Sequence, residues 1–204
     1  MPKAVDRDAR TDLVVDSLFT VIVRDGLHAA TLANIAAEAG LAIGSVRHYF
    51  GSHDELVTFA AASLTARIGG RLEQRAAALF AGPPEQRVDH AIDLLLEVLP
   101  IDEQRLVETT VWLEFTIAGR TDERFTTQAR ALHDDLRRLV TALITSGREN
   151  GRLRTELDAS VEGARLHALI DGLALHGTVY PDDGYAARAR AAITAHLESL
   201  RAPL

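Results

Sequence analysis

The sequence predicts an all-α protein, and three observations lead to this prediction. Alanine, leucine, arginine and glutamate, which favour helices, dominate the 204-residue chain. Apolar residues recur at helical spacing, and no segment shows the sustained two-residue alternation that is typical of strands. Glycine and proline separate the periodic segments, as at Gly82-Pro83-Pro84 and at Pro100.

Composition limits the classes of function. A hydrophobic fraction of 47% with 25% charged residues is typical of a soluble globular protein. The chain contains no cysteine, which excludes disulfides, thiolate metal sites and cysteine nucleophiles. It also has no run of 18 apolar residues and no apolar segment at its N-terminus, so we expect neither a membrane span nor a signal peptide, and a cytoplasmic location.

The net charge of −7 argues against a general nucleic-acid coat, because non-specific affinity depends on Lys and Arg that neutralise phosphates. Residues 1–55 alone carry five basic and eight acidic side chains, a net charge of −3. Contact with DNA would therefore have to come from one small, locally shaped patch.

The N-terminal part predicts three short helices with clear ends. A helix over about 6–25 ends before Gly26, a residue type suited to the left-handed conformation that follows many helices. In "TLANIAAEAG", Thr31 predicts an N-cap and Gly40 the exit of a second helix. The stretch "LAIGSVRHYF", residues 41–50, predicts a third helix directly after it.

A fourth helix begins at a predicted capping box. Ser52 is expected to accept a hydrogen bond from the amide of Glu55, whose carboxylate reaches back to the Ser52 amide. The helix continues to Gly69 and Gly70, which mark either a kink or a helix end because each glycine costs about 1 kcal/mol relative to alanine. Further helices are expected over residues 84–99, 102–118, 122–149, 158–179 and 184–202.

Two short helices joined by a glycine turn form a helix-turn-helix. We expect Ile43, Val46 and Phe50 to hold the second of these helices on the scaffold. Arg47, on the free face, fits a bidentate approach to guanine in the major groove. Glycine-linked helices also occur in helical bundles that do not bind DNA, so that alternative stays open.

The stretch "TLANIAAEAGLAIGSVRHYFGSHDEL", residues 31–56, resembles the N-terminal signature of TetR-family transcriptional regulators. The resemblance implies a homodimer of about nine helices, with operator DNA bound by the first three and a small molecule bound by the C-terminal domain. It places the DNA-binding domain at 1–52 and the effector-binding and dimerisation domain at 53–204. The DNA-binding residues that it implies are Thr31, Ala42, Ile43, Gly44, Ser45, Arg47, His48, Tyr49 and His53.

Three of these positions depart from the family pattern. Ala42 stands where a capping Ser or Thr is common, which weakens the cap of the recognition helix. Arg47 replaces a common Tyr and favours direct contact with guanine. His53 replaces a common Lys, and at a helix N-terminus we expect it to donate one hydrogen bond to phosphate without a full charge. Affinity should then be modest and salt-dependent.

The last two helices each carry an apolar stripe that predicts dimerisation. Two such helices from each subunit would form a four-helix interface. The alternative is that the stripes are internal core. The predicted interface residues are Leu166, Leu169, Ile170, Leu173, Gly177, Ala189, Ile193, Leu197 and Leu200.

A ligand chamber is expected within the C-terminal helices, although each candidate residue could equally be ordinary core. The only tryptophan lies in "VWLEF" beside a glutamate, a pattern compatible with an aromatic wall and a carboxylate that accepts a cation. "LIDGLALHG" resembles the C-terminal domain of the BetI-like branch and says little about the ligand. The candidates are Phe59, Phe80, Leu95, Trp112, Phe115, His133, Leu136 and His167, with Glu108 or Glu114 as polar anchors.

No other local motif indicates catalysis or a cofactor. The histidines include no HxxxH pair, and His167 and His176 lie on opposite sides of one helix, so a metal site would need several helices and none is predicted. We therefore expect a ligand-responsive repressor, not an enzyme, whose partners are palindromic operator DNA, a second copy of the chain and an unidentified small molecule, with no membrane. The alternatives are an all-helical enzyme with a His/Glu pair, a ligand-independent regulator, and a helical scaffold or dimerisation protein.

Overall fold

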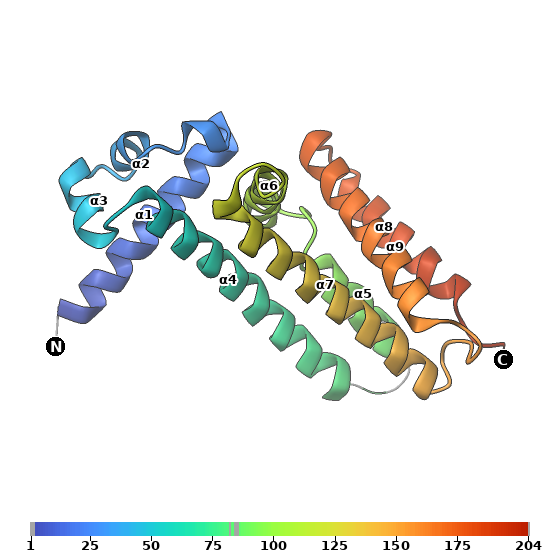
Figure 1. The fold of residues 1–204 in the computed structure, drawn as a ribbon. Helices are drawn as coiled ribbons and strands as arrows, with labels where there is room; N and C mark the ends of the chain where they lie inside the picture. Colours follow the sequence, from blue (N-terminus) through green and yellow to red (C-terminus); the bar gives the residue numbers. More distant parts are fainter. Residues whose placement is uncertain (1–2, 82, 84–85, 204) are drawn as a thin grey trace. The chain divides into compact units, whose positions relative to one another are not determined.

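The computed structural model describes the backbone of residues 3–81, 83 and 86–203 and the side chains of residues 8–77, 83 and 86–203. Within this part the chain is helical and holds no strand, which confirms the all-α prediction (Figure 1). None of its helices is long and apolar enough to cross a membrane. The elements are α1 (Lys3–Asp25), the 3-10 turn η1 (Leu27–Ala29), α2 (Leu32–Glu38), α3 (Ile43–Tyr49), α4 (His53–Ala81), α5 (Arg87–Leu96), α6 (Glu103–Ala118), α7 (Glu123–Glu149), α8 (Ala159–Val179) and α9 (Tyr185–Ser199).

The chain forms two compact units. The first comprises Met1–Arg67 and Thr110–Arg130, and the second comprises Ile68–Thr109 and Ala131–Leu204. The divisions fall inside α4, α6 and α7, so each of these helices contributes to both units. The functional boundary expected after residue 52 stays a prediction.

The first unit has a core built around α1. Val14, Leu18 and Ile22 recur on its buried face at helical spacing, and the helix packs against α2. The start of α4 adds a second buried stripe that includes Leu56 and Leu64. These apolar faces fix the scaffold on which α2 and α3 are mounted.

Helix α4 passes through Gly69 and Gly70 and continues to Ala81, so the alternative of a helix end at these glycines is wrong. A Cβ at either glycine would meet nothing within 4 Å, so neither is required by close packing. The cost of two glycines is only about 2 kcal/mol, and the buried stripe in the first half of the helix outweighs it.

In the second unit α5 and α8 both pack on α9. The approach is closest at Gly177 of α8, where an added Cβ would lie 2.3 Å from the ring of Tyr185 and 2.6 Å from Pro100. The Tyr185 hydroxyl donates to the carbonyl oxygen of Leu173 at 2.9 Å, which satisfies the phenol in this apolar setting. Glycine is therefore needed at position 177 so that α8 can pack closely on α9.

A buried ion cluster links three helices within the second unit. Glu97, only 3% exposed, accepts hydrogen bonds from Arg71, Arg75 and Arg105. Glu108 is equally buried, and its two carboxylate oxygens accept hydrogen bonds from the two terminal nitrogens of Arg71. Burial alone would raise the pKa of Glu97, but the hydrogen bonds and charges of Arg105 and Arg75 outweigh it and hold the pKa below its ordinary value.

Candidate DNA interface and ligand cavity

The turn between α2 and α3 has the geometry of a helix-turn-helix. The Thr31 hydroxyl accepts from the Asn34 amide at 3.2 Å, which confirms the predicted N-cap of α2. Gly40 has a φ of +65°, the left-handed conformation that an L side chain rarely adopts. The Leu41 amide then donates to the Ala36 carbonyl at 2.8 Å and closes the end of α2.

Helix α3 is held by its rear face and exposes its front face. Val46 and Phe50 are buried, and the Phe50 ring lies 5.4 Å from that of Phe59. Ile43 was expected to anchor the helix as well, but its side chain is 43% exposed, so this anchoring role is wrong. The exposed residues of α3 are Ile43, Gly44, Arg47 and His48, with Ser45 and Tyr49 half-buried.

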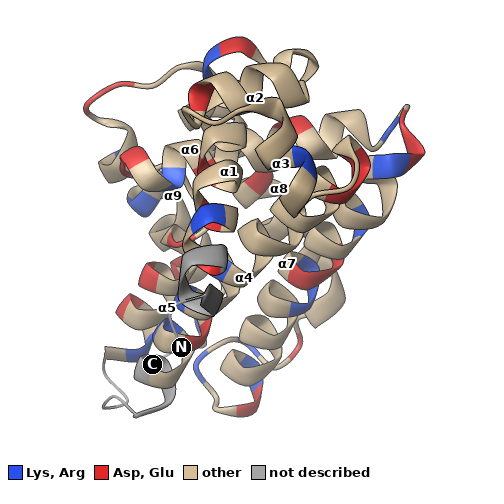
Figure 2. Cartoon of the chain, turned by 90° about the vertical axis from the view of Figure 1, so that its left-hand side faces the viewer, with Lys and Arg blue, Asp and Glu red and all other residues tan. Residues whose placement is uncertain are grey.

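The cap of α3 is weak, as expected. Ala42 occupies the N-cap position, and no side chain accepts a hydrogen bond from the first amides of the helix. These amides carry the positive end of the helix dipole, so they are available to an anion from outside the protein. Arg47 is the only basic residue besides His48 in this helix (Figure 2).

The N-terminus of α4 is tied to the motif in an unexpected way. The Glu55 amide donates to Ser52 Oγ at 3.1 Å as predicted, but the Glu55 carboxylate accepts from the Gly51 amide at 2.9 Å, one residue before the expected partner. His53 Nε2 lies 2.6 Å from the carbonyl oxygen of Ala30. A carbonyl only accepts, so Nε2 carries the proton, and the expected donation from this nitrogen to phosphate is replaced by an internal clamp.

Acidic residues of this unit are partly neutralised by arginines. Arg24 contacts Glu38 at 2.7 Å and Asp25 at 2.9 Å, and Arg124 contacts Asp54 at 3.0 Å. These pairs are exposed, so they add little stability, but they reduce the negative potential that DNA would meet. Arg124 is not among residues 1–55, so the net charge of −3 counted there leaves out its positive charge beside Asp54.

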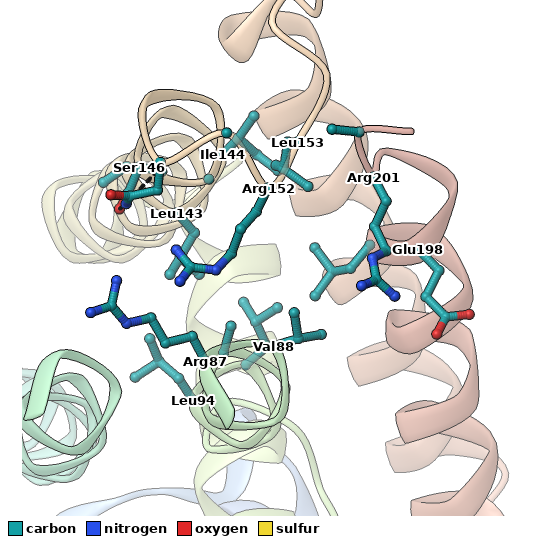
Figure 3. A pocket seen from close by; sticks show the side chains of 18 of the residues that line it. Arg87, Val88, Leu94, Leu143, Ile144, Ser146, Arg152, Leu153, Glu198 and Arg201 are labelled. Carbon is teal, nitrogen blue, oxygen red and sulfur yellow. Dashed lines mark hydrogen bonds between the residues drawn. The ribbon is translucent and has the colours of Figure 1, made fainter. Parts of the chain in front are cut away.

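The second unit contains a cavity of about 710 Å³ (Figure 3). Its walls come from α5, the C-terminal half of α7, the segment 150–153 and the end of α9, with Ala76 of α4 at one side. The walls are mainly aliphatic, and the charged side chains among them are Arg87, Arg152, Arg201 and Glu198. A cavity of this size lies within the range of about 300–1,000 Å³ that is common for small-molecule sites.

Comparisons with known proteins identify the family. Residues 15–58 match "Bacterial regulatory proteins, tetR family", and residues 84–202 match "BetI-type transcriptional repressor, C-terminal". The chain belongs to the TetR family. It is 32% identical over 201 residues to the HTH-type transcriptional regulator PksA of Bacillus subtilis (strain 168), covering 98% of this chain and 94% of that protein. It is also 30% identical over 198 residues to the HTH-type transcriptional regulator BetI of Vibrio atlanticus (strain LGP32), covering 97% and 94%.

Solved structures of transcriptional regulators share the fold. A transcriptional regulator from Rhodococcus has a TM-score of 0.77 and 25% identity, covering 93% of this chain and 95% of that one. One from Saccharomonospora viridis, solved in complex with choline, has a TM-score of 0.79 and 21% identity, covering 96% and 99%. Both resemblances predicted from the sequence, to the TetR family and to its BetI-type branch, are confirmed. The chain is a DNA-binding transcriptional regulator.

Of the predicted ligand residues of this TetR-family chain, only Leu95 lines the observed cavity. Leu136 is half-buried on α7, and the side chain of Phe80 lies outside the described part. Glu108 is held in the ion cluster, and Phe115 is fully buried against Phe125, with ring centroids 5.4 Å apart. The others are placed as follows: Phe59 is 41% exposed, Trp112 and Glu114 are half-buried on α6, and exposed His133 stacks on buried His167.

His167 also faces Asp171, with 3.6 Å between Nε2 and Oδ1. Burial lowers the pKa of His167, opposed by the Asp171 charge, and burial raises the pKa of Asp171. Among the described residues no group of three or more His, Asp or Glu side chains is placed to hold a metal. The pair therefore forms a polar contact within α8, with His167 buried and Asp171 half-buried.

The predicted dimer stripes on α8 and α9 are mostly internal core. Seven of the nine residues are buried in the single subunit, which leaves little of their surface for a partner: Leu166, Ile170, Gly177, Ala189, Ile193, Leu197 and Leu200. Gly177 packs on Tyr185, and Leu169 and Leu173 are half-buried. The periodicity correctly located an apolar face, but helices of the same chain cover it.

The charged residues of the cavity were not predicted from the sequence. Arg87, Arg152 and Arg201 stand in three separate segments, and no local motif connects them. The only signal was an arginine next to a helix boundary in each segment, at the start of α5, after α7 and after α9. Such positions are common on ordinary surfaces, so this signal could not have singled them out.

Proposed function

We propose that this chain is a homodimeric repressor whose α3 helices enter successive major grooves of a palindromic operator, and that a small molecule in the second unit releases it. The observation that carries the proposal is the two-faced α3 helix. Val46 and Phe50 hold its rear, and its front presents Arg47 and His48 next to a helix N-terminus with no side-chain cap. Such a face serves no core and has the groups that read base edges.

Seven of the nine predicted DNA-binding residues have a specific role in this proposal. Arg47 reads guanine through two parallel hydrogen bonds, and the free amides at Ala42 and Ile43 bind a phosphate oxygen. Thr31 and Tyr49 add phosphate contacts, and Gly44 lets the backbone approach the groove because no side chain intervenes. His53 acts indirectly, by fixing α4 to the segment before α2.

A dimer contact is supported by the outer face of α8 and α9. Val161, Leu175 and Val179 of α8 are each about half exposed, although they are apolar and lie at helical spacing. Between them stand exposed Ala164 and Ala168, and α9 exposes Ala187, Ala191 and Ala195 at helical spacing. Small residues permit close helix approach, so the dimer contact is proposed for this outer face in place of the buried stripes.

Helix α4 connects the two activities in this proposal. It begins at His53, beside the motif, and its residue Ala76 lines the cavity. A ligand that prefers one position of α4 shifts the population of dimers, and it lowers operator affinity by no more than its differential affinity for the two states. In this proposal the DNA-binding domain comprises residues 1–52 and the effector domain residues 53–204, so α4 is the first helix of the effector domain. The protein acts in the cytoplasm, where bacterial DNA lies, and is not an enzyme.

A gel-shift assay with the intergenic DNA beside the gene tests the proposal. We expect a specific, salt-sensitive complex with a palindromic site, and loss of that complex in Arg47→Ala with unchanged thermal unfolding. Arg130→Ala, an exposed arginine on α7, is the matched control and should bind as the wild type does. Absence of palindrome-specific binding by the wild type would overturn the repressor assignment.

The dimer surface is tested in the same assay. Leu175→Glu places a charge on the outer face of α8 and should yield monomers in analytical ultracentrifugation, with weaker binding to the full palindrome. Leu13→Glu, an equally exposed leucine on α1, is the control and should remain dimeric. A Leu175→Glu protein that stays dimeric would move the interface to another surface.

A further inference from the structure

The cavity of the second unit joins an aliphatic interior to a cluster of arginines. Leu94, Leu139 and Leu143 are among its apolar walls. Among the described residues, three arginines line it against a single glutamate, and Glu198 points away from the other labelled side chains (Figure 3). The lining therefore combines apolar surface with an excess of positive charge.

The arginines are held in place by the backbone around them. The segment after α7 pairs with the segment after α9: the Arg154 amide donates to the Leu200 carbonyl at 3.0 Å, and the Ala202 amide donates to the Arg152 carbonyl at 2.9 Å. This antiparallel bridge brings Leu153 opposite Arg201. Arg152 and Arg201 thus start from neighbouring positions on a rigid support.

Arg87 contributes from the opposite wall. It opens α5, and its side chain extends toward that of Arg152 (Figure 3). Its Nε atom is buried and has no hydrogen-bond partner among the residues that the structure describes. A buried donor without a partner is destabilising, and an acceptor supplied by a ligand would remove this cost.

The helix ends around the cavity do not cancel this positive charge. Helices α7 and α9 both terminate here, and their last carbonyls carry partial negative charge. Backbone amides occupy these carbonyls: Gly147 accepts from Arg152 and Leu153, and Glu198 accepts from Arg201. The arginines are therefore the strongest charges that face a ligand.

We propose that this cavity binds an amphipathic anion, an aliphatic molecule with one carboxylate or phosphate head. The aliphatic part lies against the leucines, and the head is held by the guanidinium groups of Arg87 and Arg152, whose planar donors match both kinds of oxyanion. The proposal rests on the proposed function in naming the class of effector that releases DNA. A quaternary ammonium such as the choline bound by the Saccharomonospora viridis protein would place like charges together here, so a different class of ligand is assigned to this chain.

The first experiment compares heads on a constant tail. Isothermal titration calorimetry is performed on the full-length protein with decanoate, decyl phosphate, 1-decanol and decyltrimethylammonium. We expect decanoate or decyl phosphate to bind at least about tenfold more tightly than the alcohol, and the ammonium to bind most weakly. Equal binding of the anions and the alcohol, or tighter binding of the ammonium, would overturn the proposal.

Variants then locate the binding. Arg87→Gln should weaken decanoate binding roughly 10- to 100-fold, as expected for one charge-assisted contact, with much less effect on decanol. Leu143→Trp should block both ligands by filling the interior. Arg138→Gln, an exposed arginine of α7 outside the cavity, is the matched control and should bind as the wild type does. Thermal unfolding verifies that each variant is folded, and unchanged decanoate binding in both cavity variants would contradict the proposed place.

A gel-shift arm separates this proposal from the proposed function. Decanoate should release the wild-type protein from its operator, but not Leu143→Trp. Operator binding that no anion affects, together with no calorimetric signal, would refute the cavity assignment and leave the repressor intact. Anion binding by a protein that binds no operator would refute the repressor and leave the cavity assignment intact.

Discussion

The recognition motif and the ligand cavity are built in opposite ways. The motif is continuous: its caps and its turn, from the Thr31 cap to the Ser52 cap, lie within residues 31–56. The cavity takes its lining from α4, α5, α7, the segment after α7 and the C-terminal segment. A site made of neighbours in sequence depends on local turn chemistry, whereas a site made of distant segments depends on how whole helices pack.

This difference predicts that substitutions in the core of the second unit lower the stability of the protein more than the loss of one turn residue of the motif does. Removing a buried charge partner, or adding a methyl group where two helices are in close contact, should lower the free energy of unfolding strongly. A substitution in the turn of the motif should lower it less. Three substitutions test the order of these effects.

Glu97→Gln should have the largest effect, a loss of about 3 kcal/mol in the free energy of unfolding, because it leaves three arginines around an uncharged group. Since the pKa of Glu97 is lowered in the folded state, its contribution is present above the unfolded value of about 4.3 and is lost as the pH falls through the folded value. Urea unfolding at pH 7 and at lower pH measures both. Exposed Glu73→Gln is the control, and equal losses in the two variants would refute the role of the cluster.

Gly177→Ala should lower the free energy of unfolding by about 2 kcal/mol. The added methyl group would clash with Tyr185 and Pro100 and would force α8 away from α9. Gly172→Ala on the same helix is the matched control. A Cβ there meets nothing within 4 Å, so this variant should be slightly more stable than the wild type. Thermal unfolding compares the two, and a Gly177→Ala protein as stable as Gly172→Ala would contradict the close helix contact.

Gly40→Ala should have the smallest effect, about 1 kcal/mol, because an L residue at a φ of +65° is strained but the space around it is open. The substitution should lower the affinity for DNA more than it lowers the stability of the fold, because it changes the orientation of α3. Gly44→Ala offers a control within the motif: it also has open space, but its φ is not positive. The Gly44→Ala protein should be about as stable as the wild type. If Gly40→Ala lowered the free energy of unfolding more than Gly177→Ala does, the comparison between the two regions would be reversed.

The same contrast explains what the sequence predicts well. The cap at Thr31, the turn at Gly40 and the bond between Ser52 and Glu55 depend on neighbouring residues, and all three occur as expected. The continuation of α4 beyond Gly69 could not be predicted, because burial elsewhere in the helix overrides the local preference of glycine.

Predictions that needed long-range packing were less successful. The stripe that includes Leu166 and Ile193 was correctly apolar, but periodicity does not state whether the covering helix belongs to the same chain. Glu108 was expected to anchor a ligand, and Arg71, distant in sequence, neutralises it instead. The anchoring expected of Ile43 failed for a related reason, since a short helix has too few turns to define which apolar residue lies at its edge.

The central claim is that sequence is read by Arg47 on a locally built α3 helix. The most direct test measures the affinities of the wild type and of Arg47→Ala for the operator and for operators in which each guanine of a half-site is replaced in turn. We predict that one replacement costs the wild type about 1–3 kcal/mol and costs Arg47→Ala almost nothing, while the other replacements affect both proteins equally. If Arg47→Ala discriminates at every position as the wild type does, base recognition lies elsewhere and the claim is wrong.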